Sequence, residues 1–183
     1  MSVLDENDSL LLIIDVQEKL LNAVFNKESL EKKAAIMSRA ATILGIQTIV
    51  TEQYPQGLGS TVNSVKENLL NINTSFYEKN SFSALDEENV FDAIRKSQKK
   101  QILILGIETH ICVNQTVNAL IELGFDVSVI KDACGSRTEI EHNAGIDRMR
   151  EDGAHIITTE IALFEWLKSS KHPNFKEIQA LIK

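Results

Sequence analysis

Short runs of apolar residues alternate along the chain with longer segments of helical periodicity. The apolar runs are continuous, without alternating polar positions, which is typical of strands buried on both faces of a sheet. These predicted strands occupy residues 10–14, 46–50, 102–105, 127–130 and 154–157. The predicted helices occupy residues 28–44, 87–98, 111–123, 139–152 and 160–168.

The residues at the ends of these segments support the same division. Gly45, Gly124 and Gly153 each come just after a predicted helix, where a left-handed residue commonly ends a helix. Thr138 and Glu141 have the spacing of a capping box. The alternation of strands and helices predicts an α/β protein with a three-layer α/β/α, Rossmann-like fold, in which helices flank a mainly parallel sheet on both faces.

Two segments lie outside this alternation. Residues from about 52 to 75 are predicted to form one long irregular loop, and such loops in compact domains are often functional. Residues 172–183 are predicted to form a short terminal helix. Because the sequence shows no linker, internal repeat or low-complexity segment, residues 1–183 are predicted to form a single domain.

The composition narrows the class of protein. A hydrophobic content of 43% and a charged content of 25% are those of an ordinary globular protein. The net charge of −7, without a run of five or six basic residues, argues against a nucleic-acid partner. The N-terminal residues do not resemble a signal peptide, and no apolar run is long enough to cross a membrane. Two cysteines are too few for a disulfide framework, so we expect a reducing compartment, the cytoplasm.

In a parallel α/β sheet, ligands bind beyond the carboxyl ends of the strands. Asp15 directly follows the predicted strand 10–14, so we expect its carboxylate to be partly buried, with a pKa open to upward adjustment. A structural role as a cap or loop contact is the alternative interpretation of Asp15. The residues after Asp15 include no glycine to approach phosphates, which argues against a dinucleotide-binding site.

Cys112 follows the predicted strand 102–105 by a short connection and opens the next helix. If Thr109 is the N-cap, Cys112 lies in the first helical turn, where free backbone N–H groups and the helix dipole favour a thiolate. Lowering the thiol pKa from about 8.5 to roughly 6 requires about 3.4 kcal/mol, which exceeds what a helix end supplies. A neighbouring cation is therefore needed.

Lys79, which is flanked by aromatic residues, is the candidate for that cation. Each residue also has a structural interpretation, with Cys112 as a small buried packing residue and Lys79 as a surface residue. A Cys112–His110 dyad is disfavoured because residues two apart on a helix do not face each other. His110 is expected to be a surface or cap residue.

Three segments of the chain together resemble one family. They are Asp-x-Gln at 15–17, Lys-x-x-Phe-Ser-Ala at 79–84, and Gly-x-x-Thr-x-x-Cys-Val-x-x-Thr at 106–116. Their order and spacing resemble those of the isochorismatase-like cysteine hydrolases, and the resemblance extends from about Leu10 to Trp166. Residues 51–59 and 131–137 resemble in particular the isochorismatase domain-containing branch, whose members mostly have no assigned substrate.

The resemblance implies a catalytic triad of Asp15 as general base, Lys79 as electrostatic support and Cys112 as nucleophile. It implies a hydrolase that cleaves a small amide-like C–N bond through a Cys112 thioester, with no cofactor. It also implies a cis peptide bond between Ile107 and Glu108, beside backbone N–H groups that would hold an oxyanion. The alternative is a catalytically weak or idle family member that acts as an oligomeric binding or scaffold module.

Further predictions concern the surroundings of the triad. The resemblance leads us to expect a homo-oligomer with a small-molecule substrate. Nicotinamidases of the superfamily carry an Asp/His/His metal site after the second strand, but residues 52–54 here are Glu-Gln-Tyr, so we predict no metal. Cys134, after the strand 127–130, is expected to be a packed thiol, and Asp132 and Arg137 are expected to form a structural ion pair. The predicted pocket residues are Gln17, Phe25, Gln53 and Tyr54 in its wall, with Glu108 and Thr109 at its edge.

Overall fold

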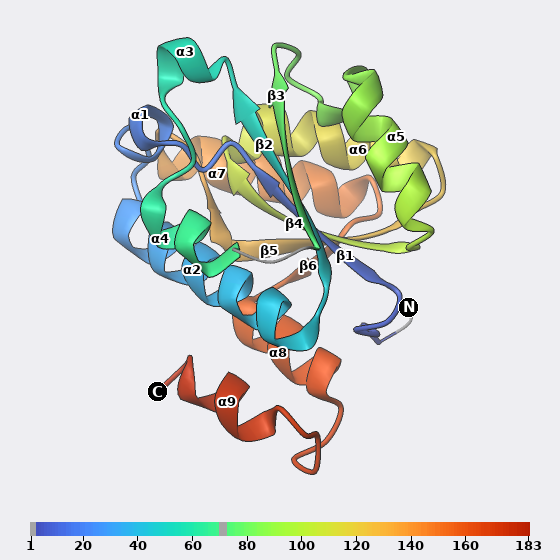
Figure 1. The fold of residues 1–183 in the computed structure, drawn as a ribbon. Coiled ribbons are helices and arrows are strands. Elements are labelled where there is room, and N and C mark those ends of the chain that lie inside the picture. The colour runs from blue at the N-terminus through green and yellow to red at the C-terminus, as the bar shows by residue number, and fades with distance from the viewer. Residues whose placement is uncertain (1–2, 70–72) are drawn as a thin grey trace.

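The computed structural model describes residues 3–69 and 73–183. Its six strands form one parallel sheet in the order β3–β2–β1–β4–β5–β6 (Figure 1). The strands are β1 (Ser9–Ile14), β2 (Gln47–Gln53), β3 (Thr74–Lys79), β4 (Gln101–Ile107), β5 (Asp126–Gly135) and β6 (His155–Ile157).

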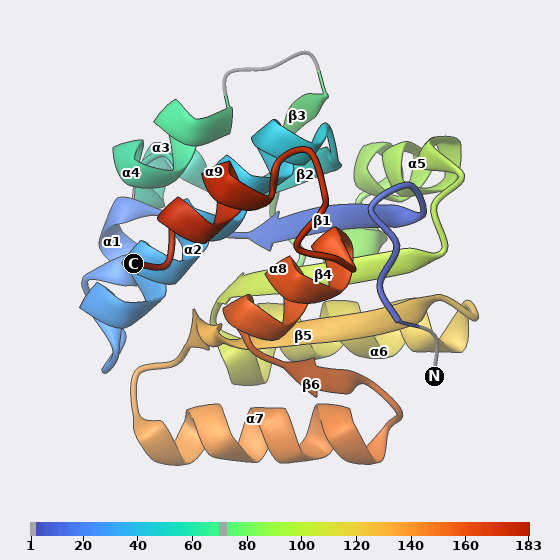
Figure 2. The same cartoon turned by 90° about the horizontal axis from the view of Figure 1, so that it is seen from below.

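Helices cover both faces of the sheet, as Figures 1 and 2 show from two directions. On one face lie α2 (Lys27–Leu44), α8 (Thr159–Leu167) and α9 (Phe175–Ala180). On the other face lie α5 (Glu88–Ser97), α6 (Asn114–Glu122) and α7 (Glu139–Glu151). The predicted three-layer α/β/α fold is therefore confirmed. Shorter helical segments occupy the connections: α1 (Glu18–Leu21), α3 (Pro55–Leu58), α4 (Asn63–Lys66), η1 (Glu67–Leu69), η2 (Ala84–Asp86) and η3 (Thr109–Val113).

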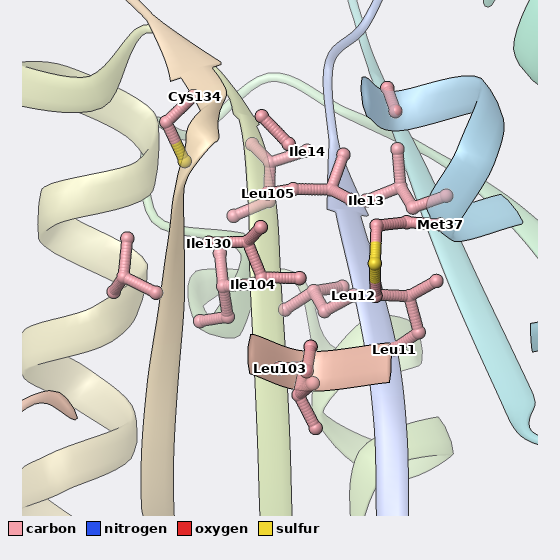
Figure 3. Close-up of a cluster of buried hydrophobic side chains, with 14 of the residues drawn as sticks. Leu11, Leu12, Ile13, Ile14, Met37, Leu103, Ile104, Leu105, Ile130 and Cys134 are labelled. Atoms are coloured by element: carbon pink, nitrogen blue, oxygen red, sulfur yellow. The ribbon is translucent and has the colours of Figure 1, made fainter. Parts of the chain in front are cut away.

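The two central strands are buried along their whole length, as the apolar runs at residues 10–14 and 102–105 predict. Leu12 of β1 pairs with Ile104 of β4 in the middle of the sheet, and both side chains have no exposed surface. Figure 3 shows these side chains with Met37 of α2 and Cys134 of β5 in the surrounding cluster. This core fixes the carboxyl ends of β1 and β4, beyond which Asp15 and the Cys112 segment follow.

Several predicted boundaries are confirmed. Gly45 caps α2 in the left-handed conformation, and the Thr138 side chain accepts a hydrogen bond from the Glu141 N–H at the start of α7. The predicted terminal helix is α9. Within the described ranges, no helix is both long enough and apolar enough to cross a membrane.

The prediction of an irregular stretch at 52–75 is wrong in two respects. The stretch contains α3, α4 and η1, and it ends in an unpredicted strand, β3. β3 lies at the edge of the sheet, and most of its residues are exposed or half-buried. Its polar sequence therefore lacks the continuous apolar run that marks a buried strand.

Strand β5 also extends beyond its predicted end. A register shift between Ile104 and Gly106 of β4 lets the two strands continue side by side to Gly135. Cys134 consequently lies within β5 and not after it. Its side chain has no exposed surface, which confirms the prediction of a packed thiol.

Candidate active site

The end of β1 places Asp15 in a fully buried position. Its backbone adopts a left-handed conformation with a φ of 52°. Its N–H donates to the Thr51 carbonyl at 3.1 Å, and its Oδ1 accepts from the Thr51 hydroxyl at 2.7 Å. Burial raises the pKa of the Asp15 carboxyl, although the positive charge of Lys79 and several hydrogen bonds oppose the effect.

Gly106 brings β4 close to β1 beside Asp15. Its φ is 136°, and a Cβ atom at this position would lie 1.9 Å from the Ile14 carbonyl oxygen. Only glycine tolerates both this conformation and this approach. The glycine of the Gly-x-x-Thr-x-x-Cys segment therefore allows the chain that leads to Cys112 to pass directly next to Asp15.

Lys79 ends the edge strand β3 and is 1% exposed. Its Nζ lies 2.7 Å from Asp15 Oδ2 and also donates to Gln53 Oε1 at 2.5 Å. The carbonyl oxygens of Ser81 and Phe82 accept from Nζ at 3.1 and 3.2 Å. A buried ammonium group needs such a set of partners to offset its lost hydration. Because β2 lies between β3 and β1, the Lys79 side chain passes the end of β2 to reach Asp15.

Cys112 lies in the π-helical segment η3, which follows β4 and leads into α6. The residue is 7% exposed. Its thiol interacts with both Asp15 and Lys79, so the three side chains form one group, here called the Asp15–Lys79–Cys112 cluster. Burial raises the pKa of the thiol to about 12, the negative charge of Asp15 adds to this rise, and Lys79 opposes it.

The expectation of a lowered thiol pKa is therefore wrong for the free protein. The sequence suggests the helix end and the cation, but it does not show the burial of Cys112 or its proximity to a carboxylate. A thiolate beside an ionised Asp15 would place two negative charges against the single positive charge of Lys79. If the thiol proton moves to Asp15, the net charge of the cluster stays unchanged. The arrangement thus favours proton transfer to Asp15 over loss of the proton to water.

The turn before Cys112 has two further features. The Ile107–Glu108 peptide bond is cis, which confirms the prediction for this turn. The Thr116 hydroxyl donates to the Cys112 carbonyl at 2.7 Å and accepts from the Ala84 N–H at 3.0 Å. Thr116 therefore connects the Cys112 segment to the segment that follows Lys79.

Comparisons with known proteins identify the family of the chain. Residues 9–161 match the isochorismatase domain, which is most of the chain. The chain belongs to the isochorismatase family. It is 39% identical over 181 residues to isochorismatase family protein 1A of Dictyostelium discoideum, an alignment that covers 97% of this chain and 87% of that protein.

Two solved structures of isochorismatase-like proteins are also similar. The MAR1 ribonuclease from Caenorhabditis elegans has a TM-score of 0.93 and 35% identity, covering 99% of this chain and 92% of that one. The YcaC gene product of Escherichia coli, described as an octameric hydrolase of unknown specificity, has a TM-score of 0.87 and 26% identity. That alignment covers 97% of this chain and 94% of the other.

In this isochorismatase-family chain, the two predicted glutamines support the cluster. The buried Gln17 side chain donates to the carbonyl oxygens of Gln53 and Gly59, at 3.0 and 2.6 Å, and accepts from the Gln53 N–H at 2.6 Å. Gln17 thereby fixes the end of β2. The Gln53 side chain in turn contacts Lys79.

The two predicted aromatic residues are exposed. Tyr54 is 54% exposed, and its N–H donates to the Lys79 carbonyl at 3.0 Å. Phe25 is 46% exposed, which excludes its alternative role as a core residue. Its ring lies 5.8 Å from the ring of His142. The role of Phe25 and Tyr54 in the pocket wall stays a prediction.

Glu108 forms the cis bond with Ile107 and Thr109 follows it, but the two residues differ in their contacts. Glu108 Oε1 accepts from Arg137 Nε at 3.0 Å, and Thr109 is fully buried. The helical segment begins after Glu108, so the predicted N-cap role of Thr109 is wrong.

The predicted Asp132–Arg137 ion pair is also wrong. Arg137 pairs with Glu108, whereas Asp132 accepts from the Thr159 N–H at 2.7 Å and lies 3.5 Å from Lys33 Nζ. β5 continues to Gly135, so Asp132 lies within the strand and Arg137 lies beyond its end. The two residues therefore belong to different parts of the structure. His110 pairs with the Ser136 hydroxyl at 3.0 Å, as expected for a residue outside a Cys–His dyad.

Sequence reasoning missed His142 and Gly145 of α7. His142 Nδ1 lies 2.9 Å from the Thr109 hydroxyl. A Cβ atom on Gly145 would lie 2.9 Å from His110 Cα and 3.1 Å from the Thr109 carbonyl carbon, so α7 packs directly on η3. A signal was present, because residues 142, 145, 146 and 149 have the helical spacing of a buried face.

The predicted absence of a metal stays a prediction. Across residues 3–69 and 73–183, no three His, Cys, Asp or Glu side chains gather as metal ligands would. Glu52, at the position where nicotinamidases begin their metal site, instead accepts from the Thr61 N–H and hydroxyl, both at 2.7 Å.

Proposed function

We propose that this isochorismatase-family protein is a cysteine hydrolase that cleaves a small amide-like C–N bond through a thioester on Cys112. The observation that supports this most directly is the Asp15–Lys79–Cys112 cluster, with a fully buried ion pair at 2.7 Å in contact with a thiol. A buried ion pair is a weak source of stability, so a functional reason for it is preferred.

The first half of the reaction forms the acyl-enzyme. The Cys112 thiol gives its proton to Asp15 as the sulfur attacks the substrate carbonyl carbon. The carbonyl electrons move to oxygen, and backbone N–H groups near Glu108 and Cys112 are proposed to hold this oxyanion. As the tetrahedral intermediate collapses, the C–N bond breaks, and Asp15 gives its proton to the leaving nitrogen.

The second half regenerates the thiol. Asp15 takes a proton from water as the water oxygen attacks the thioester carbonyl. The C–S bond then breaks, the Cys112 sulfur recovers the proton, and the carboxylic acid leaves. Lys79 stays charged throughout and offsets the negative charge that moves between Asp15, Cys112 and the substrate oxygen. The net reaction is amide plus water to acid plus amine.

The presence of Cys112 favours acyl transfer over the reaction that gives the family its name. Isochorismate hydrolases of the family cleave a vinyl ether and do not need a cysteine nucleophile. A buried cysteine in contact with a carboxylate and an ammonium group suits attack on a carbonyl carbon. We therefore place amides, ureides and carbamoyl compounds first among the candidate substrates.

The deciding experiment is a screen of small amides, ureides and carbamoyl compounds that measures ammonia release. Wild-type protein is compared with Cys112→Ala and with Cys134→Ala as the matched control. Release by wild type and by Cys134→Ala, with loss in Cys112→Ala, is the expected result. Release that persists in Cys112→Ala overturns the covalent mechanism. No release by any form, with Cys112 no more reactive toward iodoacetamide than Cys134, supports the alternative of an idle binding or scaffold module.

The name of the Caenorhabditis elegans relative favours one second candidate, RNA cleavage. The net charge of −7 argues against RNA cleavage, because binding a phosphate backbone requires a positive surface. The same protein variants are therefore also incubated with an RNA oligonucleotide, and strand cleavage is followed by gel electrophoresis. Cleavage that is unaffected by Cys112→Ala but reduced by added salt would favour this second candidate.

We also propose a homo-oligomer, on the strength of the octameric Escherichia coli relative. Light scattering of the purified protein tests this, and a monomeric mass contradicts it. A reducing compartment, the cytoplasm, is proposed because Cys112 and Cys134 are both free. Localisation of a tagged full-length chain tests that proposal.

A further inference from the structure

We propose that Glu87 is a positioning residue that holds the Lys79 ammonium group against Asp15, acting through the turn at residues 80–82 and the Gln53 side chain. The proposal rests on the proposed function, since Lys79 is the group that Glu87 is inferred to position. Glu87 precedes α5 and does not itself contact Asp15, Lys79 or Cys112 through any described hydrogen bond.

One carboxylate oxygen of Glu87 binds the turn from its outer side. Glu87 Oε1 accepts from the Asn80 N–H at 2.9 Å, the Ser81 N–H at 3.0 Å and the Ser81 hydroxyl at 3.0 Å. These three bonds lower the pKa of the Glu87 carboxyl, so the group is ionised at neutral pH. Hydrogen bonds to a charged acceptor are stronger than those to a neutral one, and the turn is accordingly held in one conformation.

The other side of the turn faces Lys79. The Asn80 carbonyl accepts from Gln53 Nε2 at 2.8 Å, and Gln53 Oε1 accepts from Lys79 Nζ at 2.5 Å. A single peptide group, formed by the Asn80 carbonyl and the Ser81 N–H, thus joins Gln53 to Glu87. The result is a continuous chain of hydrogen bonds from Glu87 to the ammonium group, and bonds in such a chain polarise one another.

The same turn supplies two more partners of Lys79. The Ser81 and Phe82 carbonyl oxygens accept from Nζ. Apart from Asp15 and Cys112, the described partners of Nζ are the turn and Gln53. Glu87 binds the turn directly, and it reaches Gln53 through the Asn80–Ser81 peptide group. A lysine side chain has many rotamers, so without this support the ammonium group would leave Asp15 and Cys112 more readily.

The test measures the pH dependence of Cys112 alkylation by iodoacetamide in the full-length protein, with Cys112 and Cys134 resolved by peptide mass spectrometry. Glu87→Ala is expected to raise the pH at which Cys112 reacts and to slow its alkylation at pH 8 roughly tenfold, equivalent to about one pKa unit. Glu87→Gln keeps an acceptor without the charge, and we expect an intermediate shift. Glu88→Gln is the matched control, because it removes the same charge from the neighbouring exposed position.

The positioning role would be overturned if the pH profiles of Cys112 alkylation in both Glu87 variants coincide with the profile of Glu88→Gln. If Glu87→Ala loses its cooperative unfolding transition, Glu87→Gln alone decides. Asp15→Asn provides the separate arm for the proposed function. If the rate of Cys112 alkylation is unchanged in Asp15→Asn, the proposed triad itself is contradicted. If Asp15→Asn changes this rate but the Glu87 variants do not, only the positioning role of Glu87 is contradicted.

Discussion

Lys79 Nζ and Asp15 Oδ2 lie 2.7 Å apart, and neither side chain has surface exposed to solvent. The two residues are 64 positions apart in the sequence and come from strands separated by β2. Their contact exists only when β1, β2 and β3 are paired in register. The ion pair therefore depends on the whole of this half of the sheet.

Removal of one member of this pair is expected to destabilise the fold. Lys79→Met leaves the Asp15 carboxylate buried without its cation, at a cost of about 3–5 kcal/mol in the free energy of unfolding. The double variant Asp15→Asn/Lys79→Met should recover most of that loss without recovering hydrolysis. Urea unfolding of the two single variants and the double variant measures the coupling. Additive effects would show that the contact contributes nothing to stability.

The two buried thiols predict a loss of stability in alkaline solution. The pKa of each rises from 9.0 to about 12, chiefly through burial, so the folded protein keeps both protons above pH 9 while the unfolded chain releases them. The stabilising contribution is therefore complete below pH 9 and declines as the pH rises toward 12. The decline is about 1.4 kcal/mol per pH unit for each thiol. Urea unfolding between pH 8 and 10.5 should show a shallower decline in Cys134→Ala than in wild type. Equal slopes contradict the prediction.

The contact between α7 and η3 predicts an unusual response to a helix-favouring substitution. Gly145→Ala would ordinarily stabilise a helix by up to about 1 kcal/mol. Here the new methyl group would lie 2.9 Å from His110 Cα, so α7 or the Cys112 segment must move. We expect a net loss of about 1–3 kcal/mol and reduced Cys112 reactivity. Asn143→Ala, at an exposed position of the same helix, is the control and should not lower stability.

His142 is predicted to hold the turn before Cys112 through Thr109. His142→Leu removes a buried hydrogen bond and should cost about 1–3 kcal/mol of stability, because the Thr109 hydroxyl loses its partner. Asn places an amide nearly where Nδ1 lies, so His142→Asn should keep more stability and more Cys112 reactivity. Thermal unfolding and alkylation rates compare the two variants. Equal behaviour would show that only the volume of the ring matters.

His142 also predicts a pH effect of opposite sign to that of the thiols. Burial lowers the pKa of its imidazole, and the charge of Lys131 adds to this while Glu139 opposes it. The unfolded chain therefore binds a proton more readily, and this contribution to stability is lost as the pH falls below about 6.5. Wild type should lose more stability than His142→Asn between pH 7 and 5, as measured by urea unfolding. The same loss in both proteins contradicts the assignment.

The parts of the fold that could be predicted are those whose signals are local. Residues 10–14 and 102–105 predict buried strands because both faces of those strands are apolar, and Gly45 predicts a helix end because its conformation is left-handed. β3 could not be predicted in this way. It pairs on one side only, and its exposed residues, Ser75, Phe76 and Glu78, interrupt any continuous buried apolar run.

The sequence indicates which residues form the candidate site, but it does not indicate how they change one another's pKa values. The spacing around Asp15, Lys79 and Cys112 indicates the family and hence the cis bond. The rise in the pKa of Cys112 depends on burial and on the Asp15 charge, which only the folded chain brings to the thiol. Glu87 and His142 were missed because their roles arise from hydrogen bonds to segments that are adjacent only in space.

The position of Lys79 on an edge strand links the candidate site to a part of the sheet that is paired on one side only. β3 is hydrogen-bonded to β2 alone, so transient separation of this strand requires breaking one ladder and leaves the other five strands paired. Each such opening would draw the ammonium group out of the cluster while most of the molecule stays folded. Inactivation by mild denaturant should consequently precede global unfolding, and amide hydrogen exchange in β3 should report the same opening.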